Sequence, residues 1–392
     1  MIIDFFQSSE KLVQNNRGLV LSQILLNGPV PRATIAERIG LTPATVSRIT
    51  RQLIELGIVE EGDAIDAPRP GRRFVSLKVR PSGCFVGGIS INAFRQDVAL
   101  TDLSGAVVAT RRVTCTDLSD AGQTLVQCAE AFNRMVDETG VDRNRLLGCG
   151  FIATGAVDPD SLIIHSAPVL NWRQVNIRDI IGEAVGVQLH ADNIPNAKNE
   201  MTHLFGVTRN RRNVLLVNVS LAVRASLLID GNIARGKTFE VGAIDNLLMP
   251  SEHETGLFTL DQLAGGYAVL DKLGITGDAA NARSLLPLLD DDSPDVSAAF
   301  FQAGRDLAYA VASINALLHP ETVLISGPLV GSEAFCDGVR ERCTELIGLD
   351  YVQDSLRCVT LSNPEAACSL AAVRSLGISA HNPASTLTGA GR

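Results

Sequence analysis

The chain has 392 residues, too many for a single hydrophobic core, and this length predicts two or three domains. Residues 1–80 contain 11 Lys and Arg against 8 Asp and Glu, whereas the whole chain carries a net charge of −9, so only the N-terminal part suits an approach to phosphates. The first residues lack the basic segment and cleavage site of a signal peptide, and the most apolar stretch, Val214–Ile229, is interrupted by Asn218 and Arg224. These features argue against a membrane span and favour a cytoplasmic protein.

A helix-turn-helix is predicted near the N-terminus. Leu19–Leu25 indicates a first helix, which Gly28-Pro29 ends. Ile35 and Ile39 then lie at helical spacing, and Gly40 supplies a residue that adopts positive φ in a tight turn. This pattern is typical of the helix that precedes a recognition helix.

The following helix has the character of a recognition helix. Thr42 is a good N-cap, Pro43 fits the first helical position, and Val46, Ile49 and Leu53 form one apolar stripe. We expect DNA contacts from the residues at its start and on its outer face, which are Thr42, Ala44, Thr45, Ser47, Arg48 and Arg51. An ordinary amphipathic hairpin is the alternative interpretation. The agreement of several local signals with the flanking elements favours a winged helix-turn-helix.

A wing of two strands is predicted after this helix. Residues 57–62 read as the first strand and residues 72–79 as the second, with alternating inward and outward side chains. The loop between them, Pro68–Arg73, is restricted by prolines and carries Arg69, Arg72 and Arg73, which suit a phosphate backbone or a minor groove. A solvated basic loop is the alternative.

Beyond residue 80 the pattern alternates strands with helices. Three strands over residues 84–110, a helix at 122–139 and a strand at 147–152 form one unit. A strand pair over 214–229 opens the second unit. Two sequential βββαβα-like units predict the α/β actin-like, ribonuclease-H-like ATPase fold. The expected domains are a winged helix-turn-helix at 1–80, a first lobe at 81–193 that includes a C-terminal helix at about 375–392, and a second, dimerising lobe at 194–374.

Several stretches, in this order and behind a winged helix, make a family resemblance specific. They are Gly88–Asn92 with Thr101–Gly105, Gly155–Asp158, Leu170–Trp172, Val187–Asn196, Leu228–Gly236, Val241–Asn246 and Ile325–Pro328. The chain resembles the family of repressors, open reading frames and kinases (ROK), which includes the xylose and N-acetylglucosamine repressors and bacterial glucokinases. The resemblance covers almost the whole chain and implies a two-lobed sugar-kinase body.

The chain departs from the kinase pattern of that family at each catalytic motif. Ser90 and Asn92 stand where the family has an Asp-x-Gly phosphate loop, and residues 220–225 contain no glycine where a second phosphate loop is expected. Ile194 replaces the Asp that acts as general base. Rescue by Asp192 would require a two-residue slip in an otherwise good match. The resemblance therefore implies a catalytically inactive body without a nucleotide cofactor.

The zinc motif of the family is also lost. The family's Gly-Glu-x-Gly-His segment corresponds to Gly242–Asn246 here, and no Cys occurs between residues 150 and 335. The eight cysteines are scattered, so ordinary buried thiols are expected rather than metal ligands or disulfides. Without metal, the segment 247–262 must be held by hydrophobic contacts. The expected anchors are Leu247, Leu248, Leu257 and Phe258.

The resemblance still implies a ligand cleft between the lobes. Its candidate residues are Gly155, Asn193, Asn196, Asn246 and Asp261. Helix capping is the alternative role for Asn193 and Asn196, and ordinary surface polarity is the alternative for Asn246 and Asp261. Because Ala243 replaces a sugar-binding Glu, an altered or acidic sugar derivative is expected in preference to plain glucose.

The sequence thus predicts a DNA-binding transcriptional regulator, a repressor, that senses a sugar-derived effector without phosphorylating it. The family resemblance implies a homodimer or a dimer of dimers on a two-fold operator. Three alternatives stay open: a ligand-independent regulator whose body only dimerises or binds a partner protein, an activator, and an active sugar kinase.

Overall fold

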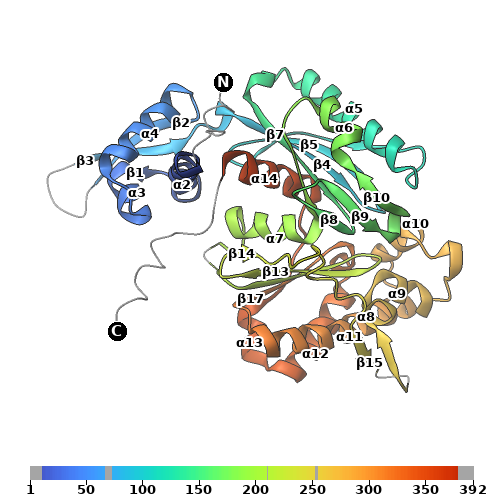
Figure 1. The fold of residues 1–392 in the computed structure, drawn as a ribbon. Coiled ribbons are helices and arrows are strands. Elements are labelled where there is room, and N and C mark those ends of the chain that lie inside the picture. Colours follow the sequence, from blue (N-terminus) through green and yellow to red (C-terminus); the bar gives the residue numbers. More distant parts are fainter. Residues whose placement is uncertain (1–10, 67–72, 210, 252–254, 378–392) are drawn as a thin grey trace.

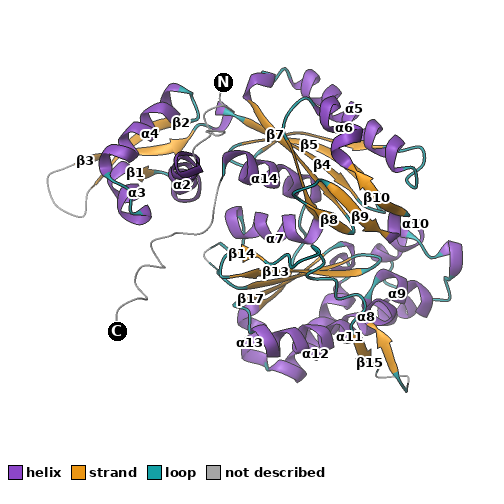
Figure 2. Ribbon diagram, in the orientation of Figure 1, coloured by secondary structure: helices purple, strands orange, loops and turns teal. Residues whose placement is uncertain are grey.

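The computed structural model of the chain describes residues 11–66, 73–209, 211–251 and 255–377. A small N-terminal domain lies beside a body of two α/β lobes, one above the other in the view of Figure 1. Each lobe is built on one sheet with helices on both faces, as the colouring in Figure 2 shows. Within the described ranges, none of the helices has the length and apolar character that crossing a bilayer requires.

The N-terminal domain is a winged helix-turn-helix. Its elements are α2 (Lys11–Asn27), β1 (Val30–Pro31), α3 (Arg32–Ile39), α4 (Pro43–Glu55), β2 (Val59–Asp66) and β3 (Arg73–Val79). Gly40 ends α3 at φ 68°, and the Thr42 hydroxyl caps α4 by accepting from the N–H of Thr45. Val46, Ile49 and Leu53 are buried as predicted. The three strands pair in the order β1-β3-β2. The wing loop, with Arg69 and Arg72, lies outside the described residues.

The first lobe contains a five-stranded sheet in the order β11-β7-β4-β5-β6. Its strands are β4 (Phe85–Ile91), β5 (Gln96–Asp102), β6 (Val107–Val113), β7 (Leu146–Ala153) and β11 (Leu189–Asn193). Helix α5 (Ala121–Thr139), which contacts α6 (Ile177–Val185), covers one face of the sheet, and α14 (Asn363–Leu376) packs on the other through β4 and β7. A Cβ at Gly150 would lie 1.9 Å from the carbonyl oxygen of Ala367, so only glycine permits α14 to approach this closely. Strands β8 (Ala156–Asp158), β9 (Ile163–Ala167) and β10 (Trp172–Asn176) form a small sheet beside it.

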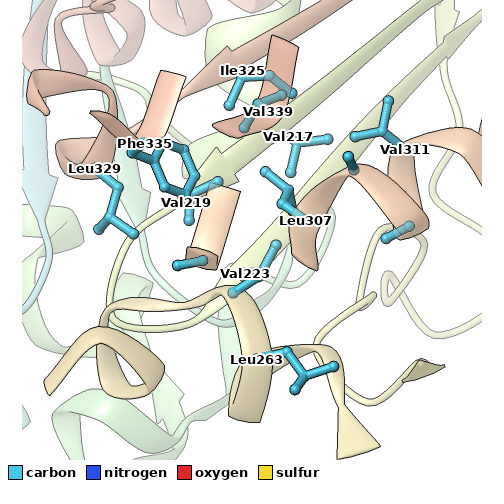
Figure 3. Packing of buried hydrophobic residues seen from close by; sticks show 14 of the residues in the cluster. Val217, Val219, Val223, Leu263, Leu307, Val311, Ile325, Leu329, Phe335 and Val339 are labelled. Atoms are coloured by element: carbon cyan, nitrogen blue, oxygen red, sulfur yellow. The ribbon is translucent and has the colours of Figure 1, made fainter. Parts of the chain in front are cut away.

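The second lobe repeats the arrangement, with the sheet order β14-β13-β12-β17-β18. Its strands are β12 (Val214–Val219), β13 (Val223–Ile229), β14 (Asn232–Ile233), β17 (Thr322–Ser326) and β18 (Leu356–Cys358). Its helices are α7 (Ile194–Phe205), α8 (Leu260–Ala264), α9 (Gly266–Lys272), α10 (Ala282–Leu285), α11 (Pro294–Leu318), α12 (Glu333–Ile347) and α13 (Leu349–Ser355). Figure 3 shows Val217, Val219 and Ile325 of the sheet packed against Leu307 of α11 and Phe335 of α12.

Alternation along the strands explains why the second-lobe sheet is covered on both faces. Leu215 and Val217 belong to the cluster with α11 and α12, whereas Val214 and Leu216 belong to a cluster on the opposite face. Helix α7 contacts β12, β13 and α14, and therefore lies between the two lobes, below α14 in Figure 1. This position makes α7 the element through which the lobes meet.

Helix α14 also connects the body to the N-terminal domain. One buried apolar cluster contains Leu21 and Ile24 of α2 together with Ala371 and Leu376 of α14. A Cβ at Gly18 would lie 2.2 Å from the carbonyl oxygen of Gly377, which shows how closely α2 approaches the end of α14. The DNA-binding domain is thus packed against a helix that contacts the sheet of the first lobe.

Two expectations from the sequence are wrong in position. The C-terminal helix of the first lobe was expected at about 375–392, but it lies at Asn363–Leu376, and residues 378–392 lie outside the described part of the chain. This helix is buried on more than one face, between the sheet and α7, so it shows no clear apolar stripe in the sequence.

The other correction concerns the segment that replaces the family's zinc loop. Leu247, Leu248 and Leu257 were expected to anchor it, yet they are 37%, 60% and 65% exposed. Strands β15 (Leu248–Pro250) and β16 (Leu257–Thr259) form a hairpin in which Met249 pairs with Phe258. Because strand side chains alternate, this pair faces the core and Leu248 and Leu257 face outward, whereas Leu247 precedes β15. Of the expected anchors, only Phe258 packs on the core.

Candidate functional site

A cavity of about 520 Å³ lies between the lobes, where the parallel strands of both sheets end. Asn92 and Thr154 follow β4 and β7, and Asn193 is the last residue of β11. Ser220 and Gly327 follow β12 and β17. Ligand sites in open α/β sheets lie outside the carboxyl ends of the strands, and a volume of this size suits a small molecule. The duplicated topology therefore creates one candidate site between the lobes.

The turn that follows β4 has its backbone donors engaged within the turn. The side-chain oxygen of Asn92 accepts from the N–H of Phe94 at 2.8 Å and from the N–H of Arg95 at 3.1 Å. In a phosphate loop such N–H groups point at the anion. Here Asn92 occupies two of them, and Ser90 is completely buried in the strand before the turn.

In the turn after β12, the N–H groups at its two ends are engaged as well. The N–H of Ser220 donates to the carbonyl of Ala222, and the N–H of Val223 donates to Asp261 Oδ1 at 2.6 Å. The Arg224 side chain also lines the cavity and forms a salt bridge of 3.1 Å with Asp245. A guanidinium side chain thus lies beside the second turn, on the second residue of β13.

At the start of α7, Ile194 occupies the position where the family resemblance predicts a general base, and the nearby carboxylate is engaged. Ile194 lines the cavity, whereas Asp192 does not and is only 1% exposed. Asp192 Oδ1 accepts from Asn196 Nδ2 at 2.9 Å, and its Oδ2 lies 2.5 Å from Arg235 Nη2. Arg374 of α14 lies 4.0 Å from the same oxygen. This carboxylate is a structural group of the interface between the lobes.

The structure brings three of the five predicted ligand residues to the cavity. Gly155, Asn193 and Asp261 line it, whereas Asn196 and Asn246 do not. Asn193 also caps α7 by accepting from the N–H of Asn196 at 2.9 Å, so the capping role applies as well. Asn196 is buried and directly follows Pro195, which lines the cavity. Asn246 is exposed and lies outside the cavity wall.

Asp261 has an unusual environment for a carboxylate. Burial raises its pKa to about 6, and the neighbouring charge of Asp245 acts in the same direction. The N–H of Val223 and the guanidinium of Arg224 oppose that shift. This carboxyl group lines the second-lobe part of the cavity, where it can accept hydrogen bonds from ligand hydroxyl groups.

The sequence analysis missed the cationic residues of the cavity. Lys198, Arg95 and Arg112 line it together with Arg224. Lys198 lies four residues after Ile194, and this spacing places both side chains on one face of α7. That periodicity could have identified Lys198 once Ile194 was placed at the cleft. Arg95 and Arg112 come from a turn and a separate strand, and no local pattern brings them together.

Among the described residues no group of three or more His, Cys, Asp or Glu side chains is arranged to hold a metal ion. The segment that corresponds to the family's zinc motif instead contributes Gly242, Ala243 and Asp245 to the cavity wall. The N–H of Ala225 donates to the carbonyl of Gly242 at 2.8 Å, which ties this segment to β13.

The predicted DNA-contacting residues of α4 lie on one side of the N-terminal domain. Thr42, Ala44, Arg48 and Arg51 are exposed, and Thr45 and Ser47 are half-buried. Arg73 begins β3, and nothing further is described for its side chain. Burial and the charge of Arg48 lower the pKa of Arg17 in α2, so a further arginine lies beside this face.

Comparisons with known proteins agree with both parts of the structure. Residues 15–60 match the winged helix-turn-helix DNA-binding family, and residues 86–366 match the ROK family. The chain is 25% identical over 361 residues to the DNA-binding transcriptional dual regulator NagC of Escherichia coli K12, covering 88% of each chain.

Solved structures show the same fold. A ROK family transcriptional regulator described as a homologue of the E. coli MLC protein superposes with a TM-score of 0.73 at 20% identity, covering 93% of this chain and 96% of the other. A ROK family glucokinase from Streptomyces griseus, in complex with glucose and AMPPNP, superposes with a TM-score of 0.58 at 16% identity, covering 74% of this chain and 98% of that one. The chain carries an N-terminal winged helix-turn-helix and belongs to the ROK family.

Proposed function

We propose that this chain is a cytoplasmic transcriptional regulator, acting as a repressor, whose ROK body senses a sugar-derived effector and does not phosphorylate it. One observation carries the proposal: a winged helix-turn-helix is joined to a body whose cavity has N–H groups of both candidate phosphate-loop turns engaged within the protein. The names of NagC and of the MLC homologue support the regulatory part.

DNA contact follows from the exposure of α4. We propose that Thr42, Ala44, Thr45 and Ser47 lie near the base edges at the start of the helix, and that Arg48 and Arg51 contact bases or phosphates further along. Arg69, Arg72 and Arg73 of the wing contact the backbone or the minor groove. A homodimer or tetramer, implied by the family, would place two such domains on a two-fold operator.

Phosphoryl transfer is disfavoured at three separate points. Ile194 cannot accept a proton, and Asp192 is paired with Arg235 away from the cavity. Several N–H groups of the turns after β4 and β12 already donate within the protein. Removing a general base alone slows a reaction by roughly 10²–10⁴-fold. The cavity therefore suits binding without chemistry.

A contiguous set of contacts links the cavity to the DNA-binding domain. Asn193 lies in the cavity wall, and the preceding Asp192 contacts Arg235 and Arg374. Arg374 lies near the end of α14, where α14 packs on α2. We propose that an effector which changes the angle between the lobes also moves α14, and with it the winged helix.

A binding experiment tests this function. Operator fragments selected with the purified protein are titrated with and without sugars, sugar acids and sugar phosphates, and thermal unfolding is followed in parallel. We expect one of these ligands to raise the unfolding temperature and to change operator affinity without ATP. If no sugar derivative does either while the operator is still bound, the ligand-independent regulator replaces the sensor.

A further inference from the structure

A buried lysine of α7, the helix between the lobes, lines the cavity. Lys198 is 3% exposed, lines the cavity, and donates from Nζ to Asn218 Oδ1 at 2.9 Å. Its hydrogen-bond partner is a neutral amide. An ammonium group taken out of water is costly unless an opposite charge or several acceptors compensate it. The side chain is therefore held in a position where an anion would relieve that cost.

Two arginines from the first lobe reach the same cavity. Arg95 lies 3.0 Å and Arg112 lies 3.7 Å from a single carboxylate, that of Asp97 behind the cavity wall. One carboxylate thus pairs with two guanidinium groups. Both arginine side chains are also substantially exposed, Arg95 by 44% and Arg112 by 66%. The charge of Arg95 acts on Lys198, so the two arginines and Lys198 form one cationic group in the cavity wall.

Another part of the cavity wall, formed by residues within 240–261 of the second lobe, supplies carboxyl groups. Asp245 pairs with Arg224, and Asp261 and Glu240 add two further carboxyl groups. Carboxylates accept hydrogen bonds from hydroxyl groups, whereas the cations Lys198, Arg95 and Arg112 accept none and suit an anion. The cationic group therefore fits an anionic part of a ligand, and the carboxyl groups fit its hydroxyl groups.

We propose that Lys198, assisted by Arg95 and Arg112, forms a subsite for the anionic group of the effector, and that the effector is a sugar bearing a carboxylate or a phosphate. The proposal deepens the proposed function and rests on it. Helix α7 supports the subsite, because its N-terminal residues Ile194 and Pro195 line the same cavity and the positive end of the helix dipole favours a bound anion.

Calorimetric titrations with matched probes test the subsite. Glucose, glucuronate and glucose 6-phosphate, and N-acetylglucosamine with its 6-phosphate, are titrated into the full chain and into Lys198→Met and Lys237→Met. Lys237 is an exposed lysine that does not line the cavity. We expect at least one anionic sugar to bind ten times or more tightly than its neutral parent, and Lys198→Met to weaken it by about 10- to 100-fold. Lys237→Met should leave it within twofold.

The outcomes distinguish a sugar acid from a sugar phosphate, and failure of the anion subsite from failure of the proposed function. Preference for glucuronate identifies a sugar acid, and preference for a 6-phosphate identifies a sugar phosphate. Neutral sugars that bind as tightly as their anionic partners, no anionic probe that binds, or anion binding that Lys198→Met leaves unchanged would each overturn the subsite. A neutral sugar that still changes operator affinity would then leave the proposed function standing.

A second measurement on the unmodified protein does not depend on how the variant folds. Burial and the charge of Arg95 lower the pKa of Lys198 to about 7. The other charged groups around the cavity are Arg112, Asp97, Arg224, Asp245, Asp261 and Glu240. Of these, Asp261 has a pKa of about 6 and is ionised above pH 7, as is glucuronate. Glucuronate affinity should therefore fall from pH 7 to pH 9, with proton uptake on binding. A flat profile above pH 7 contradicts the role of Lys198.

Discussion

The recognition helix and the cavity use charged residues in opposite ways. Arg48 and Arg51 are exposed on α4, and their placement depends only on the helix and its cap. In the cavity, Arg224 is tied to Asp245, and Asp192 outside the wall is tied to Arg235. The proposed DNA-contacting surface is therefore set by a local pattern, whereas the cavity is assembled from partners far apart in the chain.

This difference has an energetic consequence. Removing an exposed charge costs little stability, and its effect appears in binding. Removing one partner of a buried pair leaves the other uncompensated, and its effect appears in folding as well. Substitutions in the two regions should therefore separate operator affinity from stability.

The largest expected effect concerns catalysis. Coupled assays with common hexoses and Mg-ATP should show no turnover, because we propose that Ile194 replaces the general base and because N–H groups of both candidate phosphate-loop turns already donate within the protein. Turnover that Asp192→Asn abolishes would contradict the account, since it would place Asp192 in an active site rather than in the interface between the lobes.

The next effect compares a buried ion pair with an exposed one. Arg235→Met leaves the buried Asp192 carboxylate with Arg374, 4.0 Å away, as the cation beside it. The substitution should lower the free energy of unfolding by about 3 kcal/mol. Arg212→Met removes an exposed pair with Asp230 and serves as the control, with an expected loss of about 0–1 kcal/mol. Urea unfolding measures both, and equal losses would remove the distinction between the two kinds of pair.

On the recognition helix, Arg48→Ala should weaken operator binding by about 1–3 kcal/mol and relax sequence choice. Its unfolding temperature should stay unchanged, because Arg48 is exposed. Arg72→Ala with Arg73→Ala should weaken all sequences alike and flatten the salt dependence. Gel shifts at several salt concentrations distinguish these effects, and unaltered operator binding in both variants would refute the proposed DNA face.

The smallest effect concerns Asp261. Its pKa is raised from 3.8 to about 6, so between these values the folded protein binds more protons than the unfolded chain and stability falls as pH rises. Asp261→Asn keeps an acceptor for the N–H of Val223 and removes the buried charge. It should raise stability by about 1–2 kcal/mol at pH 7 and have little effect at pH 4. Thermal unfolding at both pH values checks this, and an equal gain at both would contradict it.

Elements with a strong local signal were predictable from the sequence. The Thr42 cap, the Gly40 turn and the stripe of Val46, Ile49 and Leu53 are as predicted. Helix α14 was misplaced because several of its faces are buried, which removes the apolar periodicity. The leucines of the 247–258 hairpin were misjudged because hydrophobicity alone does not tell which face of a short strand is buried.

The candidate site was predictable only in part. Gly155, Asn193 and Asp261 line the cavity, because each lies near a strand end or turn that the fold brings there. The hydrogen bonds that Asn92 and Asp261 accept from N–H groups of these turns were not predictable, because they depend on side-chain rotamers. Asp261 also lies 38 residues from its donor, Val223. The same holds for Lys198, whose partner Asn218 is 20 residues away on another element.

The most direct test of a sensor without catalysis is operator affinity measured by fluorescence anisotropy with a bound sugar derivative and no nucleotide. The account predicts that the derivative changes the operator Kd by tenfold or more, equally in the presence and absence of ATP, and that Arg374→Met reduces this change while effector binding persists. A change in Kd that requires ATP, or an effector that binds without any change in operator affinity, would contradict it.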